Sequence, residues 1–363
     1  MISYEKAVVN KIISRDESTS WIELSCKNKV KKAINYNDLT GAIRPGDKVI
    51  VNTTAVNLSL GTGGQHFVIF NYSNEEAELD GRGHIMKLRY SPFQVRVLAA
   101  EEEDGDFHEE VKNFESLDGH IVIVATLHSM LGPLAAMLKY LDSSLKINYI
   151  MTDAGALPIA FSNTVKKLKG LGLIDKTITV GHAFGGDYEA TNIYTGLIVS
   201  KEALEADITI VAMGPGIVGT GTKYGFSGVE QGINLDAVNN LGGYPLVVPR
   251  IGFKDERERH LGLSHQSRTV LKDIANTRGN LVFPLMDQPK AELVAGQLRE
   301  SGIDKKHSIF YEDGREIGSA LETYGLDVRT MGRGIEDDPE FFYSLGAVGR
   351  FAYNLINKEM GKC

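Results

Sequence analysis

Apolar and polar positions divide the chain into two parts with different patterns. In residues 1–98, short apolar stretches alternate with polar turns, one of them at Pro45-Gly46. The expected strands cover residues 8–14, 21–26, 31–36, 46–52, 65–70 and 84–89. Short strands at regular spacing favour a small barrel or a sandwich. We therefore predict a β-rich N-terminal domain over residues 1–98.

From residue 119 onward, strand patterns alternate with helical patterns. The expected strands cover residues 120–126, 146–152, 177–181, 208–213, 244–249, 280–284, 307–311 and, more weakly, 326–330. The expected helices cover residues 131–141, 159–169, 191–204, 227–240, 265–276, 287–300 and 339–357. Repeated βα units indicate a mostly parallel, doubly wound (Rossmann-like) sheet with helices on both faces. We predict this α/β domain over residues 119–363, joined to the first by an acidic, solvated linker at 99–118.

Composition narrows the class of protein. The chain has 363 residues and a formal net charge of −8, which argues against a general nucleic-acid binder but allows a nucleotide ligand. No segment approaches the ~18 uninterrupted apolar residues of a membrane span, and the first ten residues do not form a signal peptide. The cysteines, Cys26 and Cys363, suit a reducing cytoplasm without a disulfide framework or a cysteine-based zinc site.

The segment 207–230 holds the densest chemistry. The apolar run 208–213 predicts a buried parallel strand, and a glycine-rich turn and a helix beginning near Ser227 follow it. This arrangement presents backbone N–H groups and a helix N-terminus to an anion. Ser227 and Glu230 also have the spacing of a capping box. The predicted ligand-binding residues of this segment are Gly214, Gly216, Gly219, Thr220, Gly221, Thr222, Ser227 and Glu230.

A specific cofactor does not follow from these glycines. Gly214-x-Gly216-x-x-Gly219 has the spacing of the dinucleotide fingerprint, but Pro215 lies within the turn and the helix begins late. Arg250 occupies the place of the acidic residue that an NAD site requires, although an arginine could bind the 2′-phosphate of NADP. Walker and Gly-x-Ser-x-Gly motifs are absent from the sequence, which argues against those classes of hydrolase. The cofactor is therefore left unassigned.

Other strand ends supply candidate catalytic residues, because ligands of open α/β sheets bind at the carboxyl ends of the strands. His128, Asp153 and His182 follow three predicted strands, and Asp187 lies beyond the turn Gly185-Gly186. An imidazole can transfer protons near neutral pH, and Asp187 could orient His182. The structural alternatives are a hydrogen-bonding His128 at a helix entrance and a helix-capping Asp153.

The segment after the fifth strand carries the cationic candidates. His265 and Arg268 are predicted ligand contacts, and Arg257 and Arg259 could clamp a phosphate or carboxylate, with a solvated charge run as the alternative. Ser264 is expected to cap the helix that contains Arg268. The turn 332–334 could bring a further cation. No metal ligand is assigned, although a His-Asp pair could bind Zn²⁺ or Mn²⁺.

The glycine-rich segment 60–64 in the first domain has two interpretations. It forms a flexible β-turn, or it lets the backbone approach a ligand and acts as part of a lid. The sequence favours the first interpretation.

Several long motifs resemble the uncharacterised bacterial family catalogued as domain of unknown function 3866. Two of them are Met-Thr-Asp-Ala-Gly-Ala-Leu-Pro at 151–158 and Gly-His-Ala-Phe-Gly-Gly-Asp at 181–187. Further motifs lie at 57–64, 214–222, 257–265 and 330–334. The resemblance covers nearly the whole chain and implies a cytoplasmic bacterial protein. It supplies no reaction, cofactor or catalytic residue.

These observations together predict an enzyme that acts on a small anionic metabolite at the carboxyl ends of the strands, and phosphorylated or nucleotide-like compounds are among the candidates. The alternatives are a non-catalytic metabolite sensor and, less favoured, an NADP-dependent oxidoreductase. We expect no nucleic-acid partner and no membrane partner. Whether the chain forms a homo-oligomer is left open.

Overall fold

The computed structural model describes residues 1–60, 64–255 and 257–360. The chain forms two compact units, residues 1–96 (unit 1) and 97–363 (unit 2). Each unit has its own hydrophobic core. No helix in the described part of the chain is both long enough and apolar enough to cross a membrane.

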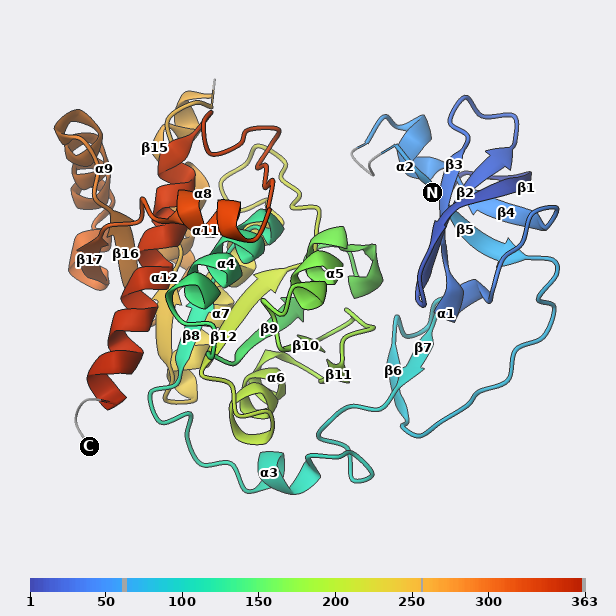
Figure 1. Cartoon of the computed structure of the whole chain (residues 1–363), viewed down its shortest axis with the longest axis horizontal. Coiled ribbons are helices and arrows are strands. Elements are labelled where there is room, and N and C mark those ends of the chain that lie inside the picture. Colours follow the sequence, from blue (N-terminus) through green and yellow to red (C-terminus); the bar gives the residue numbers. More distant parts are fainter. Residues whose placement is uncertain (61–63, 256, 361–363) are drawn as a thin grey trace. The chain divides into compact units, whose positions relative to one another are not determined.

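Unit 1 contains a closed five-stranded barrel with the strand order β1-β2-β3-β5-β4 (Figure 1). Its strands are β1 (Tyr4–Arg15), β2 (Thr19–Ser25), β3 (Lys32–Tyr36), β4 (Lys48–Asn52) and β5 (His66–Asn71). The short helices α1 (Asn37–Thr40) and α2 (Thr54–Asn57) flank β4. β3 and β5 run parallel, and the other neighbours run antiparallel. The sequence predicts either a barrel or a sandwich, and the structure shows a closed barrel.

Alternating side chains explain the closure of this barrel. In β1, Ala7 and Val9 are buried while Lys6 and Val8 are exposed, which is the period-2 pattern of a strand with one face in a core. Inward-facing residues of all five strands fill the interior. Register shifts within β1 let this long strand pair with both β2 and β4, because bulges bend a strand. A separate two-stranded sheet follows, made of β6 (Ile85–Lys87) and β7 (Val95–Val97).

Unit 2 is built on an eight-stranded, all-parallel sheet with the order β11-β10-β9-β12-β8-β13-β16-β17 (Figure 1). Its strands are β8 (Ile121–Val124), β9 (Ile147–Thr152), β10 (Lys176–Thr179), β11 (Tyr188–Glu189), β12 (Ile208–Met213), β13 (Tyr244–Val247), β16 (Asn280–Pro284) and β17 (Ser308–Glu312). The predicted α/β class with a parallel sheet is confirmed. Every residue of β12 is buried, as expected for a central strand covered on both faces.

Helices cover both faces of this sheet. One face packs against α4 (Leu131–Leu141), α5 (Asn163–Gly170), α11 (Ile317–Thr323) and α12 (Pro339–Met360). The other face packs against α6 (Ile193–Ile198), α7 (Glu230–Asn240) and α9 (Gln288–Ser301). Smaller elements are α3 (His108–Lys112), α8 (His265–Thr269), α10 (Ile303–Lys306) and the short hairpin of β14 (Ile251–Gly252) with β15 (Gly262–Leu263).

The strand order positions the site. The connections that leave β8 and β9 run over the α4–α5 face, whereas those that leave β12 and β13 run over the opposite face. Connections therefore diverge between β9 and β12 and again between β8 and β13. Such divergence leaves room for ligands at the carboxyl ends of the strands. The loop after β12 and the segment after β13 both begin at this edge.

One local prediction about structure was wrong, and a second was confirmed only in part. Residues 326–330 do not form a strand, because Thr330 pairs only with Arg333 in a tight turn. The acidic stretch after residue 98 is solvated only in part, because Glu103, Asp104 and Asp106 are exposed while Glu101 and Glu102 bind the backbone. Glu102 is only 7% exposed and accepts a hydrogen bond from the Ala99 N–H at 2.7 Å, and Glu101 accepts one from the Thr191 N–H at 2.7 Å. These carboxylates satisfy backbone donors that would otherwise lack partners.

Candidate functional site

A cavity of about 170 Å³ lies at the carboxyl ends of β12 and β13, and we call it the basic cavity. Four predicted ligand residues meet there: Gly219, Gly221, Thr222 and His265. The other described residues that line it are Ile217, Val218, Gly225, Phe226, Arg250, Arg257, Arg259, His260, Gln266 and Met331. Three arginines and two histidines therefore face the glycine-rich loop.

The glycine-rich loop folds back as a small hairpin. Gly219 and Phe226 form an antiparallel bridge, and the Thr220 N–H donates to the Gly225 carbonyl at 2.7 Å. The hydroxyl oxygens of Thr220 and Thr222 lie 2.9 Å apart, and the Thr220 hydroxyl also donates to the Gly225 carbonyl. These hydroxyls hold the loop together. Direct contact of either threonine with a ligand remains a prediction.

Arg250 is partly buried in the wall of the basic cavity. Its guanidinium donates to Gln266 Oε1 at 3.1 Å and lies 3.1 Å from the Met331 sulfur, and both partners are neutral. Burial lowers the pKa of Arg250 from its ordinary value, but an arginine remains cationic at neutral pH. Among the described residues, no carboxylate lies within ion-pair distance of it. Asp255 and Asp338 act on the Arg250 cation only from a greater distance, and a bound anion would give it a direct charged partner.

Arg257 differs from Arg250 because it already has a carboxylate partner. Its Nε and Nη2 donate to the two carboxylate oxygens of Asp255, each at 2.9 Å. This pairing holds the pKa of Asp255 well below its usual range. Arg333 also approaches Asp255, at 3.5 Å. Arg333 lies 3.7 Å from Asp338 as well, so Arg257 and Arg333 both have carboxylate partners, unlike Arg250.

Two histidines pack against each other in the basic cavity. The ring centroids of His260 and His265 are 4.8 Å apart. Burial, together with Arg250 and Arg257, lowers the pKa of His260 to about 4, and burial also lowers the pKa of His265. Both rings are therefore neutral at pH 7. Within the described part of the chain, Nδ1 of each ring is buried without a hydrogen-bond partner, so both rings have unused polar atoms.

The charge and size of the basic cavity restrict the chemical groups that it can hold. No carboxylate is present among its described lining residues, so its field attracts anions. A volume of about 170 Å³ is smaller than the roughly 300–1,000 Å³ of sites for drug-sized ligands. The cavity therefore suits a phosphate or a carboxylate group. The predicted contact Arg268 does not line it.

Glu230 lies at the other side of the glycine-rich segment. The predicted capping box is wrong, because α7 begins at Glu230 itself and Ser227 accepts a hydrogen bond from the Val218 N–H at 3.2 Å. The Glu230 carboxylate instead accepts from the Thr152 hydroxyl at 2.6 Å. Burial raises the pKa of Glu230 to about 7, assisted by the charge of Asp153 and opposed by the Thr152 hydrogen bond. A carboxyl group that titrates near pH 7 can act as a general acid or base.

We call Thr152, Asp153 and Glu230 the acidic cluster. Asp153 is exposed and accepts a hydrogen bond from the backbone N–H of His182 at 3.0 Å. A Cβ at Gly181 would lie 2.3 Å from Asp153 Oδ2, and Gly181 has a φ of +63°. Glycine is therefore required there. Asp153 thus connects the loops after β9 and β10 at the same edge of the sheet.

Backbone packing couples the loop after β9 to the glycine-rich loop. The Ala156 N–H donates to the Pro215 carbonyl at 2.8 Å. A Cβ at Gly155 would lie 2.3 Å from the Gly214 carbonyl oxygen, so only glycine allows this approach. Pro215, which weakened the dinucleotide prediction, supplies the accepting carbonyl. The acidic cluster and the basic cavity are therefore joined by one packed pair of loops.

His128 has protein partners on both ring nitrogens. Its Nε2 lies 2.6 Å from the Ser162 hydroxyl, and its Nδ1 lies 3.3 Å from the Met213 carbonyl. The Tyr149 hydroxyl is 3.4 Å from the same Nδ1. Burial lowers the pKa of His128 to about 4. The ring links the end of β8 to α5 and β12, as the structural alternative expects, and a catalytic role stays a prediction.

Asp187 is held near the start of β10, whereas His182 follows the end of that strand. The Asp187 carboxylate accepts hydrogen bonds from the Thr177 N–H at 2.8 Å and from the Thr177 hydroxyl at 2.9 Å, and it forms an ion pair with Lys169. These bonds lower the pKa of Asp187 against the opposing effect of burial. They favour a structural role for Asp187, and its assignment to catalysis stays untested.

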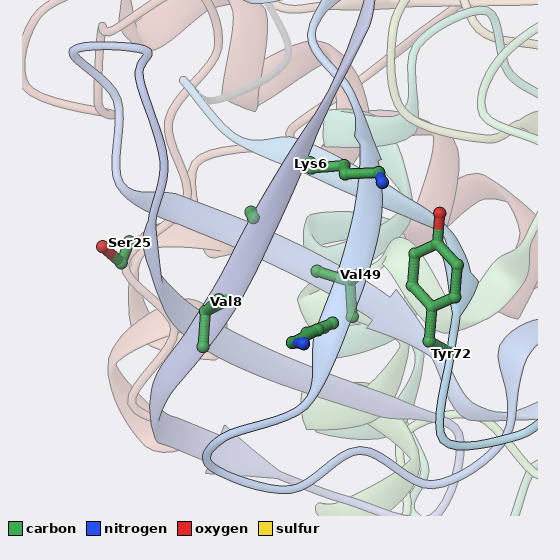
Figure 2. Close-up of a pocket in the computed structure, with 7 residues that line it drawn as sticks. Lys6, Val8, Ser25, Val49 and Tyr72 are labelled. Carbon is green, nitrogen blue, oxygen red and sulfur yellow. The ribbon is translucent and has the colours of Figure 1, made fainter.

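Unit 1 has a larger but less specific cavity of about 640 Å³. Figure 2 shows Lys6, Val8, Val49 and Tyr72, which line it together with Ala7, Ser25 and Lys48. The Lys6 ammonium lies 5.7 Å from the centroid of the Tyr72 ring. This surface combines lysine and apolar side chains, and the described residues that line it include no histidine and no carboxylate. It ranks below the basic cavity as a candidate site.

The model of the family described as protein of unknown function (DUF3866) matches residues 32–349. The chain belongs to this family. No curated protein and no solved structure matches the chain. The family match covers the basic cavity and the acidic cluster, and the family description names no reaction, so function must be argued from these residues.

Sequence reasoning assigned some of these residues incompletely. Arg250 was considered only as a contact for a 2′-phosphate, and Thr152 and Met331 were given no role. The position of Arg250 directly after an apolar strand was a usable signal. No local pattern pointed to Met331, because its place in the cavity depends on the turn before α12.

Proposed function

We propose that unit 2 binds a small anionic metabolite, with a phosphate or carboxylate group of the ligand in the basic cavity. The observation that carries this proposal is the partly buried Arg250, whose hydrogen-bond partners are neutral. An oxyanion would accept charge-assisted hydrogen bonds from its guanidinium. The exposed Arg259 and the glycine-rich loop border the same cavity.

The acidic cluster makes catalysis the favoured form of this function. Glu230 has a raised pKa near 7, so it can exchange a proton with a substrate at neutral pH. Asp153 lies beside it and raises that pKa. The proposed enzyme holds its substrate by the anionic group and transfers a proton through Glu230. His182 stays a second candidate for proton transfer, because it follows β10 at the same edge.

A metabolite sensor is the second candidate. The bonds that occupy both nitrogens of His128 favour it, because they remove one of the predicted bases. An NADP-dependent oxidoreductase is less well supported, since about 170 Å³ can hold a phosphate but not a dinucleotide. The free thiol of Cys26 supports a reducing cytoplasm as the proposed location.

Two arginine variants, one in the basic cavity and one elsewhere as a control, test anion binding. Titration calorimetry of the whole chain with inorganic phosphate, pyrophosphate and a small dicarboxylate identifies the preferred group. Arg250→Gln is expected to weaken binding by about 10- to 100-fold, since a hydrogen bond to a charged group contributes roughly 1.5–3 kcal/mol. Arg299→Ala, on the exposed side of α9, is the matched control and should bind normally. Equal loss in both variants, or none in Arg250→Gln, would contradict the proposal.

The enzyme and the sensor are separated by Glu230→Gln. The variant and the parent are incubated with a metabolite extract, and the consumed and formed compounds are identified by mass spectrometry. The enzyme hypothesis expects turnover only in the parent and retained anion binding in both proteins. A parent that binds a metabolite without converting any compound supports the sensor.

A further inference from the structure

Three side chains with metal-binding atoms meet in the barrel of unit 1. Glu5 comes from β1, Cys26 follows β2, and His66 begins β5. One ligand atom of each residue lies within 4.8 Å of the others. Glu5 shares the inward-facing side of β1 with Ala7, while Lys6 faces outward. The cluster therefore lies on the inner side of the barrel strands.

We propose that unit 1 binds one Zn²⁺ ion, or a divalent transition-metal ion of similar preference, through Glu5, Cys26 and His66. Thiolate, imidazole and carboxylate are the ligand types that Zn²⁺ prefers, whereas Mg²⁺ and Ca²⁺ select oxygen ligands. Three protein ligands leave a coordination position for water or another donor. The site belongs to unit 1, so it does not depend on the function proposed for unit 2.

The separations of the three atoms fit an ion between them. An ion centred among atoms at most 4.8 Å apart lies no more than about 2.8 Å from each, compared with about 2.0–2.3 Å in zinc sites. Closing the difference requires shifts of roughly half an ångström per ligand. Side-chain rotation can supply such shifts without moving the barrel.

The turn after β2 supports all three ligands. The Asn28 N–H donates to Glu5 Oε1 at 3.1 Å. The Val30 carbonyl lies 3.2 Å from His66 Nε2 and 3.4 Å from the Cys26 sulfur. Hydrogen bonds of this kind orient metal ligands and are typical of the outer shell of a metal site.

His66 gives an independent indication that a ligand is expected. Its side chain is fully buried, and Nδ1 has no partner with hydrogen-bond geometry in the described part of the chain, although the Asn52 backbone lies near the ring. An imidazole nitrogen without a hydrogen-bond partner can offer its lone pair to a metal. A buried polar atom without a partner is otherwise unfavourable.

Metal binding requires the loss of the Cys26 thiol proton. Burial and the hydrogen bond with Glu5 raise the pKa of Cys26, while the ammonium of Lys31, 3.9 Å from the sulfur, opposes this rise. The metal forms a bond to the thiolate sulfur, and the proton passes to solvent. Cys26 and Glu5 precede residue 32, where the family match begins, so the site is inferred from this chain alone.

The test uses Co²⁺ and Zn²⁺ with the full-length, reduced, metal-free chain. Titration with Co²⁺ should produce a thiolate-to-cobalt charge-transfer band that saturates at one ion per chain and disappears when Zn²⁺ is added. Cys26→Ser should abolish the band and weaken Zn²⁺ binding at least 100-fold. Glu5→Gln should weaken Zn²⁺ binding about 10- to 100-fold. Cys363→Ser, which changes the other cysteine of the sequence, is the matched control and should bind as the parent does.

Circular dichroism checks that each variant folds. Protection of Cys26 from alkylation by Zn²⁺ in the parent provides a second readout, and Glu5→Gln keeps the thiol in place if Cys26→Ser fails to fold. The inference is overturned if the parent gives no saturable band, if Cys26→Ser keeps it, or if Cys363→Ser loses it.

Discussion

At the scale of single residues, the account depends on charges that the fold leaves in unusual surroundings. Arg250 is a partly buried cation with neutral partners, and Glu230 is a carboxyl group with a pKa near 7. Both arrangements are unfavourable for an isolated fold. Proteins retain such groups where a ligand or a reaction uses them, which is why perturbed pKa values are frequent at functional sites.

Replacing Glu230 should change the pH dependence of stability. The unfolded carboxyl group loses its proton near its ordinary pKa of 4.5, and the folded group loses it only near 7. Between these values unfolding releases a proton, so the contribution of Glu230 to stability falls as pH rises through 7. The whole effect corresponds to at most roughly 3 kcal/mol. Glu230→Gln should therefore stabilise unit 2 at pH 8, relative to the parent, more than at pH 5.

Urea unfolding at the two pH values measures this difference. Glu300→Gln, an exposed position on α9, is the control and should shift the midpoint equally at both values. If Glu230→Gln has the same relative stability at pH 5 and pH 8, the carboxyl group is not held in its protonated form.

At the scale of elements, the site depends on loops that pack after parallel strands. The loop after β9 and the loop after β12 approach so closely that Gly155 has no room for a Cβ. Thr152, at the end of β9, binds Glu230, at the start of α7. The acidic cluster therefore exists only while β9 and β12 are neighbours. The sequence predicts that Glu230 belongs to a capping box at the start of a helix. Its hydrogen bond with Thr152 instead holds it at the carboxyl edge of the sheet.

Gly155→Ala tests this loop packing. The added Cβ would lie 2.3 Å from a backbone oxygen of Gly214, so the loops must separate at a cost of about 1–3 kcal/mol. Anion binding should weaken as well, because the glycine-rich loop moves. Gly296→Ala in α9 is the control, since nothing lies within 4 Å of its Cβ; it should be neutral or stabilise by up to about 1 kcal/mol. Thermal denaturation compares the two, and equal stability of both variants would refute the packing argument.

Local patterns predicted the elements well but not their neighbours. The apolar run 208–213 is strand β12, and the alternation in β1 gave the barrel its inner face. The sequence contained no signal that β12 inserts between β9 and β8, because strand order depends on crossover connections rather than on local preference. For the same reason, the partner of Glu230, 78 residues away, could not be predicted. The metal ligands of unit 1 were missed because they are far apart in the sequence.

At the scale of the whole molecule, each unit carries its own candidate chemistry. Unit 1 presents a thiol, an imidazole and a carboxylate on the inner side of a barrel, and unit 2 presents a basic cavity and an acidic cluster on a parallel sheet. The lid proposed for residues 60–64 falls mainly on residues outside the described ranges. The function of one unit can therefore be tested without assuming the function of the other.

Ligand-specific stabilisation should distinguish the two units. A ligand that binds only the folded state raises the stability of the unit that holds it. In scanning calorimetry of the whole chain, Zn²⁺ should raise the unfolding temperature of unit 1, and the preferred anion should raise the unfolding temperature of unit 2. Cys26→Ser should remove only the first effect and Arg250→Gln only the second. Loss of both effects in either variant would contradict separate sites.

The central claim is that the basic cavity is an anion site, and a crystal of the chain grown with tungstate, a heavy analogue of phosphate, tests it most directly. Anomalous scattering locates the tungsten atom without assuming where it binds. The account predicts one peak between Arg250 and the glycine-rich loop, within hydrogen-bonding reach of the guanidinium, and no peak there in Arg250→Gln. A peak only at other surfaces, or an empty basic cavity at saturating tungstate, would contradict it.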